Sequence, residues 1–164
     1  MIEVEITDEM KKRAWAKARQ MGEINNSITH GDGNIAGFIG EEVANAVIGG
    51  MVNNTYDYDI TDGDVTYDVK TKRCTSPPKD FYECSVAEYN TRQKCDRYVF
   101  VRIEYVNKRW GRAWVLGWMD KKKYLKKAVK LRKGDIDDSN GFVVKANCYN
   151  MKIKDLNSFE EVMK

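Results

Sequence analysis

The feature that most constrains the fold of this chain is an expected β-hairpin whose turn contains the Asp-Gly pair at 62–63. The flanking segments 56–60 and 65–71 are rich in aromatic and β-branched residues, which favour strands. An Asp-Gly pair between two such segments favours a tight two-residue turn. The sequence therefore predicts two antiparallel strands with a defined register.

The predicted register brings acidic and basic side chains together. With the Asp-Gly pair at the tip, Asp59 is expected to face Thr66 on the second strand. Side chains alternate between the two faces of a strand, so Asp59, Asp68 and Lys70 are expected on one face. Two carboxylates and an ammonium group would then share a surface.

Such a surface is costly unless a cation binds to it. Neighbouring like charges raise carboxylate pKa values, and a bound divalent cation reverses that penalty. Mg²⁺ prefers about six oxygen ligands and keeps several waters, so a few carboxylates and a phosphate oxygen would satisfy it. A metal-bound water could attack a phosphodiester, while Lys70 orients that water or stabilises developing negative charge.

Further elements extend the pattern on both sides of the hairpin. Upstream, the segment Gly-Phe-Ile-Gly-Glu at 37–41 is expected in a helix that carries Glu41. Downstream, the sequence predicts a strand at 81–86, a helix at 87–94 and another buried strand at 97–105. This order resembles that of the PD-(D/E)xK nucleases, a superfamily that includes many restriction enzymes, recombination exonucleases and junction resolvases.

The resemblance implies a fold, an activity and a set of site residues. It implies an α/β fold in which residues 1–164 form one domain with a restriction-endonuclease-like core, a mixed β-sheet flanked by helices. It implies hydrolysis of DNA by a nuclease that depends on Mg²⁺ or Mn²⁺. By resemblance, Lys70 is the catalytic lysine, and the metal ligands are the side chains of Glu41, Asp59 and Asp68 and the backbone carbonyl of Val69. The overall pattern resembles small phage-encoded members.

The chain departs from the family pattern at two positions. Tyr58 stands where the motif has its proline, and the second acid, Asp68, is an aspartate. Two alternatives stay open as ligands, Asp57 in place of Asp59 and Glu42 in place of Glu41. Strand parity cannot choose between Asp57 and Asp59, and spacing favours Asp59.

Positive charge is concentrated in the second half of the chain. The net charge is only +3, but residues 102–133 hold 12 basic and 2 acidic side chains. A block of this kind attracts a phosphate backbone, although it also fits a solvated helix face. The residues expected to contact nucleic acid are Lys72, Arg73 and Lys79 beside the site, and Lys121, Lys122 and Lys123 in the basic block.

The remaining sequence suggests one intracellular domain. A strand is expected at 1–6 and a helix at 8–21, followed by a polar, glycine-rich loop at 25–34 in which His30 could assist proton transfer. No apolar run approaches the roughly 18 residues of a membrane span, and we expect a cytoplasmic protein, in the host cell if it is phage-encoded. Cleavage of both strands of a duplex often requires a homodimer, but no heptad pattern marks an interface.

Two rival interpretations belong to other functional classes. One is a non-catalytic nucleic-acid-binding module that retains the nuclease fold and functions through its basic block. The other is a scaffold with zinc bound to its four cysteines. None of these cysteines forms a C-x-x-C pair, so reduced thiols are the expected state.

Overall fold

The computed structural model describes residues 1–21, 32–138 and 140–160, so His30 and most of its predicted loop lie outside the described residues. Within these ranges the helices, including the short 3₁₀ helices η1 and η2, and the strands are β1 (Ile2–Val4), α1 (Asp8–Met21), α2 (Asp32–Ile48), β2 (Met51–Val52), β3 (Ile60–Asp62), β4 (Val65–Cys74), β5 (Glu83–Ala87), η1 (Glu88–Arg92), β6 (Arg97–Val106), β7 (Arg109–Asp120), α3 (Lys121–Lys127), β8 (Val129–Leu131), β9 (Ile136–Asp137), β10 (Phe142–Val143), β11 (Cys148–Lys152) and η2 (Ile153–Asp155).

A mixed sheet forms the centre of the molecule. Its strand order is β1-β7-β6-β4-β3-β2. The strands β4 and β6 pair in parallel, and the other neighbouring strands of this sheet pair antiparallel. A smaller antiparallel sheet has the order β5-β11-β8. The predicted fold class, a mixed α/β fold with helices against the sheet, is confirmed.

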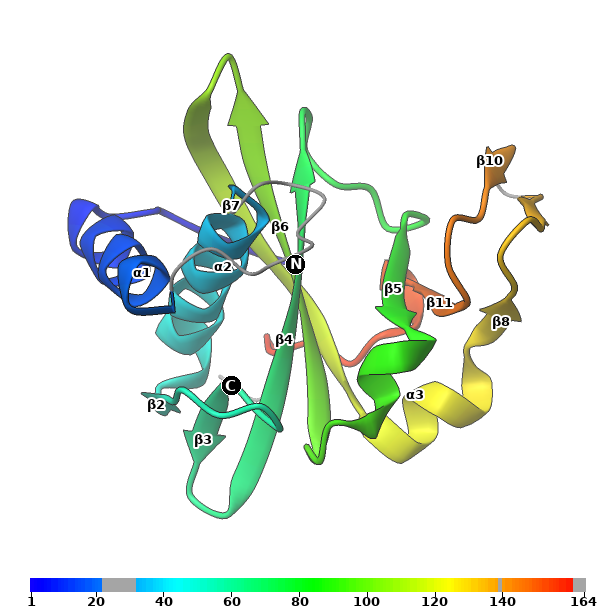
Figure 1. Cartoon of the computed structure of the whole chain (residues 1–164), viewed down its shortest axis with the longest axis horizontal. Coiled ribbons are helices and arrows are strands. Elements are labelled where there is room, and N and C mark those ends of the chain that lie inside the picture. The colour runs from blue at the N-terminus through cyan, green and yellow to red at the C-terminus, as the bar shows by residue number, and fades with distance from the viewer. Residues whose placement is uncertain (22–31, 139, 161–164) are drawn as a thin grey trace.

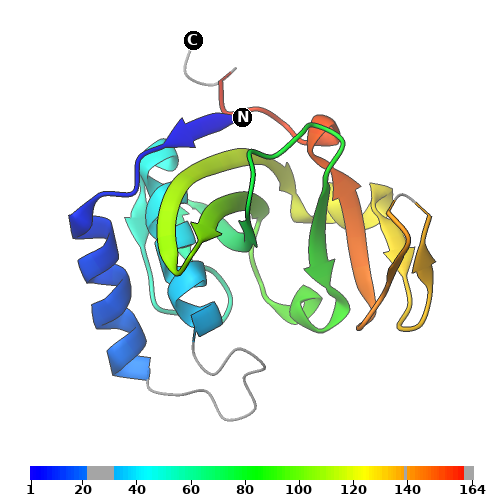
Figure 2. The ribbon, with the colours of Figure 1, turned by 90° about the horizontal axis from the view of Figure 1, so that it is seen from above.

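Each face of the main sheet is covered by a different layer. Figure 1 shows α1 and α2 on one side of the curled sheet and β5, β8, β11 and α3 on the other, and Figure 2 shows the same layers from above. Two hydrophobic cores follow from this arrangement. One contains Ile39 of α2 and Val99 of β6, and the other contains Tyr98 of β6 and Tyr124 of α3.

The central strand β6 is buried because both of its faces are covered. All side chains from Tyr98 to Ile103 are buried, as expected for a strand in the middle of a covered sheet. On α2, Ile35, Ile39 and Val43 recur every four residues and form the apolar stripe that packs on the sheet. The burial pattern of these two elements fixes α2 across the strands that carry the acidic residues.

The predicted hairpin forms, but its register differs from the expected one. The ladder pairs Asp62 with Val65, Thr61 with Thr66 and Ile60 with Tyr67, so the turn consists of 63–64. Gly63 has φ +58°, and a two-residue turn with glycine in this conformation at its first position suits a hairpin well. Because the pairing is shifted by two positions, the assignment of side chains to faces survives. Just before the ladder, the Asp59 N–H donates a hydrogen bond to the Tyr67 carbonyl.

The segment 56–60 is not the predicted strand, since only Ile60 belongs to β3. The Thr55 hydroxyl accepts a hydrogen bond from Tyr58 N–H and donates one to Tyr58 C=O, and such local bonds compete with a ladder. The strand expected at 81–86 occurs as β5 but belongs to the small sheet. The helix expected at 87–94 is only the short 3₁₀ helix η1.

Other predicted elements are close to the observed ones. The strand at 1–6, the helix at 8–21 and the strand at 97–105 correspond to β1, α1 and β6. In the basic block, α3 ends at Lys127 because Ala128 is extended, and the chain continues into β8, where Val129 is exposed. Among the described residues, no helix combines the length and apolar character needed to cross a membrane.

Candidate active site

Three elements bring the acidic residues to one place. Glu41 lies on α2, Asp59 directly precedes β3, and Asp68 lies on β4. The helix approaches the strand closely at Gly40, where an added Cβ would lie 1.9 Å from Thr71 Oγ1. Only glycine allows this approach, and the next residue along the helix is Glu41.

The carboxyl groups of Asp59 and Asp68 form the centre of the site. Asp59 Oδ2 accepts a hydrogen bond from the N–H of Val69 at 2.7 Å, and the two carboxyl groups lie within hydrogen-bonding reach of each other. Desolvation by burial raises the pKa of Asp59 to about 6, and the nearby charge of Glu41 adds to this effect. Burial also raises the pKa of Asp68 to about 7, although the Lys70 charge opposes the shift. The pair therefore favours a shared proton over two negative charges.

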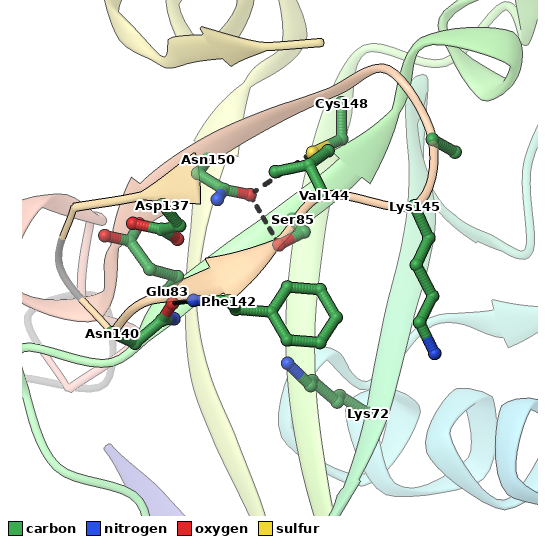
Figure 3. A pocket seen from close by; sticks show the side chains of 11 residues that line it. Lys72, Glu83, Ser85, Asp137, Asn140, Phe142, Val144, Lys145, Cys148 and Asn150 are labelled. Carbon is green, nitrogen blue, oxygen red and sulfur yellow. Dashed lines mark hydrogen bonds between the residues drawn. The ribbon is translucent and has the colours of Figure 1, made fainter. Parts of the chain in front are cut away.

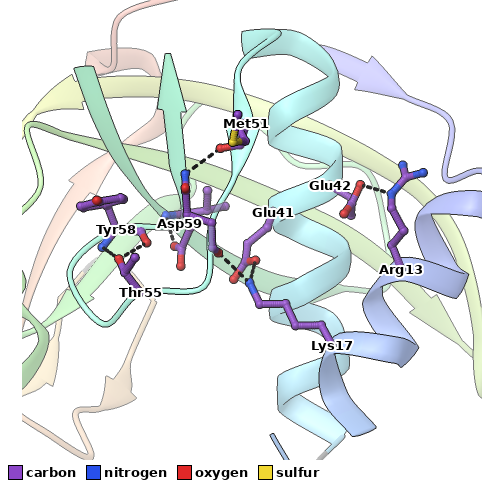
Figure 4. Close-up of polar contacts among 10 residues, drawn as sticks. Arg13, Lys17, Glu41, Glu42, Met51, Thr55, Tyr58 and Asp59 are labelled. Carbon is purple, nitrogen blue, oxygen red and sulfur yellow. Dashed lines mark hydrogen bonds and ion pairs between the residues drawn. The ribbon is translucent and has the colours of Figure 1, made fainter. Parts of the chain in front are cut away.

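Glu41 is buried, with 7% of its surface exposed, and contacts a lysine that the sequence did not indicate. Lys17 of α1 donates to Glu41 Oε2 at 2.5 Å and to the backbone carbonyl of Asn53 at 3.0 Å (Figure 4). Burial raises the pKa of the Glu41 carboxyl even though the Lys17 hydrogen bond and charge lower it. The carboxyl of Glu41 also lies within hydrogen-bonding reach of Asp59.

Lys70 is held between Asp68 and Gln93, a second residue that sequence reasoning missed. Its Nζ lies 2.6 Å from Asp68 Oδ2 and donates to Gln93 Oε1 at 3.1 Å. Gln93 Nε2 donates in turn to the Tyr56 carbonyl at 2.8 Å, and the Gln93 carbonyl accepts a hydrogen bond from Lys121. Gln93 therefore connects the catalytic-lysine candidate to the loop before β3 and to the basic block.

The two alternative ligands lie elsewhere. Glu42 Oε2 accepts a hydrogen bond from Arg13 Nε at 2.9 Å and faces α1 (Figure 4). Asp57 Oδ1 accepts from the N–H of Lys94 at 3.0 Å. The structure thus brings Glu41 and Asp59, the favoured pair, together beside Asp68.

The basic residues expected to contact nucleic acid are spread over several surfaces. Lys72 shares a strand face with Lys70, and both lysines line a cavity beside the site. Arg73 points to the opposite face, where its guanidinium lies 5.2 Å from the Tyr105 ring centroid. The other four are Lys79 above the Phe81 ring, Lys121 on Gln93, Lys122 on the exposed side of α3, and Lys123 at 3.5 Å from Asp120.

The three carboxyl groups of the site would be more stable with a divalent cation between them than without one. Glu41, Asp59 and Asp68 supply hard oxygen donors, and burial raises their pKa values even though Lys17 and Lys70 lie beside Glu41 and Asp68. Buried Asp68 Oδ2 has an ion-pair partner in Lys70 but no hydrogen bond. Within the described ranges, no three His, Cys, Asp or Glu side chains already form a group that could hold a metal ion, and Lys17 and Lys70 lie against Glu41 and Asp68.

Comparison with known proteins gives no family for the chain. No protein-family model matches the sequence, and no curated protein matches it. The functional argument therefore depends on the residues and the geometry of the site.

Proposed function

We propose that this protein is a metal-dependent nuclease that hydrolyses phosphodiester bonds in DNA at the Glu41, Asp59, Asp68 and Lys70 site. The observation that carries the proposal is the meeting of three carboxyls and one lysine from separate elements in a largely buried cluster. Buried like charges of this kind are costly, and clusters of strongly perturbed carboxyls are found more often at functional sites than elsewhere. We also propose that the core is restriction-endonuclease-like, as the resemblance implies.

Each residue has a defined part in the proposed reaction. Glu41, Asp59 and Asp68 would hold Mg²⁺ or Mn²⁺, which when bound would acidify a water and neutralise charge on the phosphate. Lys70, released from Asp68 as that carboxylate turns to the cation, would donate a hydrogen bond to the attacking water or to a phosphate oxygen. Gln93 would keep the lysine in place during this exchange, since it already accepts a hydrogen bond from Lys70 Nζ.

Lys17 would act as a stand-in cation in the metal-free protein. Its ammonium is bound to Glu41 and would have to leave this carboxylate when the metal binds. The neighbouring Asn53 carbonyl offers it a second acceptor. An exchange of this kind keeps the buried charge compensated in both states.

The test is a cleavage assay with four purified proteins: wild type, Asp68→Asn, Lys70→Met and the control Asp64→Asn, whose carboxyl is exposed in the turn of the same hairpin. Supercoiled plasmid, linear duplex and single-stranded DNA are incubated with Mg²⁺, Mn²⁺ or EDTA. We expect metal-dependent cleavage by the wild type and the control and none by the two site variants. Equal activity in Lys70→Met and wild type would refute the assignment.

A specific observation favours a second candidate function, a nucleic-acid-binding module without catalysis. Lys17 and Lys70 already compensate Glu41 and Asp68, so the cluster could serve as a structural ion-pair network. In that case the basic residues of α3, including Lys121, would carry the function. DNA binding without cleavage and without metal binding would support this candidate.

A further inference from the structure

A cleft leads away from the candidate active site, between the main sheet and the small sheet. A cavity of about 240 Å³ is lined by Lys70, Lys72 and Glu83, and an adjoining cavity of about 500 Å³ is lined by Lys72, Glu83 and Ser85. The larger cavity is shown in Figure 3. Because Lys72, Glu83 and Ser85 line both cavities, the cleft continues from Lys70 toward the β9–β10 hairpin. Its larger part has the size of a small-ligand pocket.

The inner part of the cleft brings two cations side by side. Lys72 and Arg102 are direct partners in the parallel pairing of β4 and β6, and like charges in this position destabilise a sheet. The pKa of Lys72 is lowered by desolvation and by the Arg102 charge. Arg102 donates to the Glu83 carbonyl at 2.9 Å, and in the described part of the chain neither cation has a carboxylate within ion-pair distance. An anion between them would remove this repulsion.

The position of this pair relative to Lys70 suggests which anion it receives. Lys72 follows Lys70 by two residues on the same strand face, a separation of about 6.6 Å along β4. This is close to the separation of successive phosphates in an extended nucleic-acid strand. If Lys70 lies at the scissile phosphate, Lys72 and Arg102 lie at the neighbouring one.

The outer part of the cleft has the properties of a site for a nucleobase. Ser85 Oγ donates to Asn150 Oδ1 at 2.6 Å and so fixes the amide of Asn150, which is 8% exposed. Burial and the Asp137 charge raise the pKa of Glu83, so this carboxyl would gain from a hydrogen-bond donor. The Phe142 ring is 54% exposed at the mouth of the cavity and offers a face for stacking (Figure 3).

We propose that this cleft binds one unpaired nucleotide next to the scissile phosphate, with its phosphate on Lys72 and Arg102 and its base between Phe142 and the polar wall formed by Glu83 and Asn150. The substrate would then be DNA with a single-stranded segment or a flipped nucleotide at the cut. The identity of the neighbouring phosphate as scissile rests on the proposed function. The presence of a single-strand site does not, since it depends only on the cleft.

The test is equilibrium binding in EDTA, where cleavage does not interfere. Fluorescence anisotropy would measure the affinity of a labelled single strand of about 12 nucleotides, a length within the usual range of such sites, and of the matching duplex. The proteins are wild type, Lys72→Met, Phe142→Ala and the matched control Lys12→Met, whose lysine is exposed on α1 across the main sheet. Lys72 and Phe142 are both exposed, so their variants are expected to fold, which circular dichroism would check.

We expect Phe142→Ala to weaken single-strand binding by about fivefold or more and to leave duplex binding unchanged, because it removes one stacked base. Lys72→Met should lower affinity and reduce the salt dependence by about 0.7, the value for one phosphate contact on a single strand. The control should match wild type. The proposal is overturned if wild type does not bind the single strand at low salt, or if both variants bind it as the control does.

These outcomes separate the two proposals. Loss of single-strand binding in the cleft variants, with no cleavage by wild type under any metal, would retain the nucleotide site and reject the nuclease. Metal-dependent cleavage by wild type, with unchanged binding and cleavage in both cleft variants, would retain the nuclease and reject the nucleotide site.

Discussion

Replacement of Asp68 by asparagine should change how the stability of the metal-free protein depends on pH. The carboxyl is 2% exposed, and its pKa is raised from the usual 3.8 to about 7 in the folded state. A carboxyl with a raised pKa favours the folded state at low pH, and this contribution is lost as the pH rises through the folded-state value. Asparagine keeps the shape of the side chain and has no charge to bury.

The size of the effect follows from the shift. One pKa unit corresponds to about 1.4 kcal/mol, so between pH 5 and pH 7 the wild type should lose at most about 3 kcal/mol relative to Asp68→Asn. Coupling to Asp59, whose pKa is also raised, spreads the loss over both carboxyls. The Lys70 charge attracts only the ionised form of Asp68 and already opposes the shift in its pKa, so the loss of this ion pair in the variant is contained in the pH-dependent difference.

Urea unfolding in EDTA at pH 5, 6, 7 and 8 measures this difference directly. The free energy of unfolding comes from the midpoint and the slope of each transition, and equal slopes confirm that the unfolded states are comparable. Asp64→Asn is the matched control because its carboxyl is exposed in the same hairpin. Parallel curves for Asp68→Asn and wild type between pH 5 and pH 7 would refute the claim that burial raises the pKa of Asp68.

Three further predictions concern neighbouring contacts. Gly40→Ala should lower the free energy of unfolding by about 1–3 kcal/mol in thermal unfolding, because the added Cβ overlaps Thr71. It should also reduce metal affinity by displacing Glu41. Unchanged stability would contradict the close approach of α2 to β4. Lys17→Met should tighten Mn²⁺ binding in calorimetry, because it removes the cation that competes for Glu41, and weaker binding would show that Lys17 supports the metal site. Tyr124→Phe should cost about 1 kcal/mol in urea unfolding, because the hydroxyl lies 2.8 Å from two backbone carbonyls in the small sheet; no change would mean that these contacts contribute nothing.

The acidic centre could be predicted from the sequence because strand alternation depends only on parity. The turn was placed one residue too early along the chain, but the error shifted the pairing by two, so Asp59 and Asp68 still share a face. The same alternation also places Arg73 on the face opposite Lys70, and it could have removed Arg73 from the residues expected beside the site. Local patterns are therefore sufficient for the relation between residues of one hairpin.

The remaining parts of the site depend on contacts between distant segments. Lys17 contacts Glu41 because α1 packs on α2. The way in which two helices pack cannot be predicted from the sequence of either helix alone. The sequence signal for this contact is a pair of basic residues one turn apart on α1, Arg13 and Lys17, which form ion pairs with the adjacent acids of α2. Gln93 follows the short 3₁₀ helix η1, where a longer helix was expected, and contacts Lys70 across 23 residues of sequence.

The cleft could not be predicted from the sequence for a similar reason. Its two walls belong to different sheets, and β5 was expected to follow the hairpin within one sheet. Lys72 and Arg102 become neighbours only through the parallel pairing of β4 with β6. Sequence alternation indicates which way each side chain points but does not identify the opposite strand.

The most direct test of the account is a calorimetric titration of Mn²⁺ into wild type, Asp59→Asn and the control Asp64→Asn at pH 8, where the raised pKa values of Asp59 and Asp68 leave both carboxyls largely ionised. If the acidic cluster is a metal site, wild type and control bind Mn²⁺ saturably, and Asp59→Asn binds it at least about tenfold more weakly. Absence of Mn²⁺ binding by the wild type, or equal binding by Asp59→Asn, would contradict the assignment of this cluster as a metal-dependent active site.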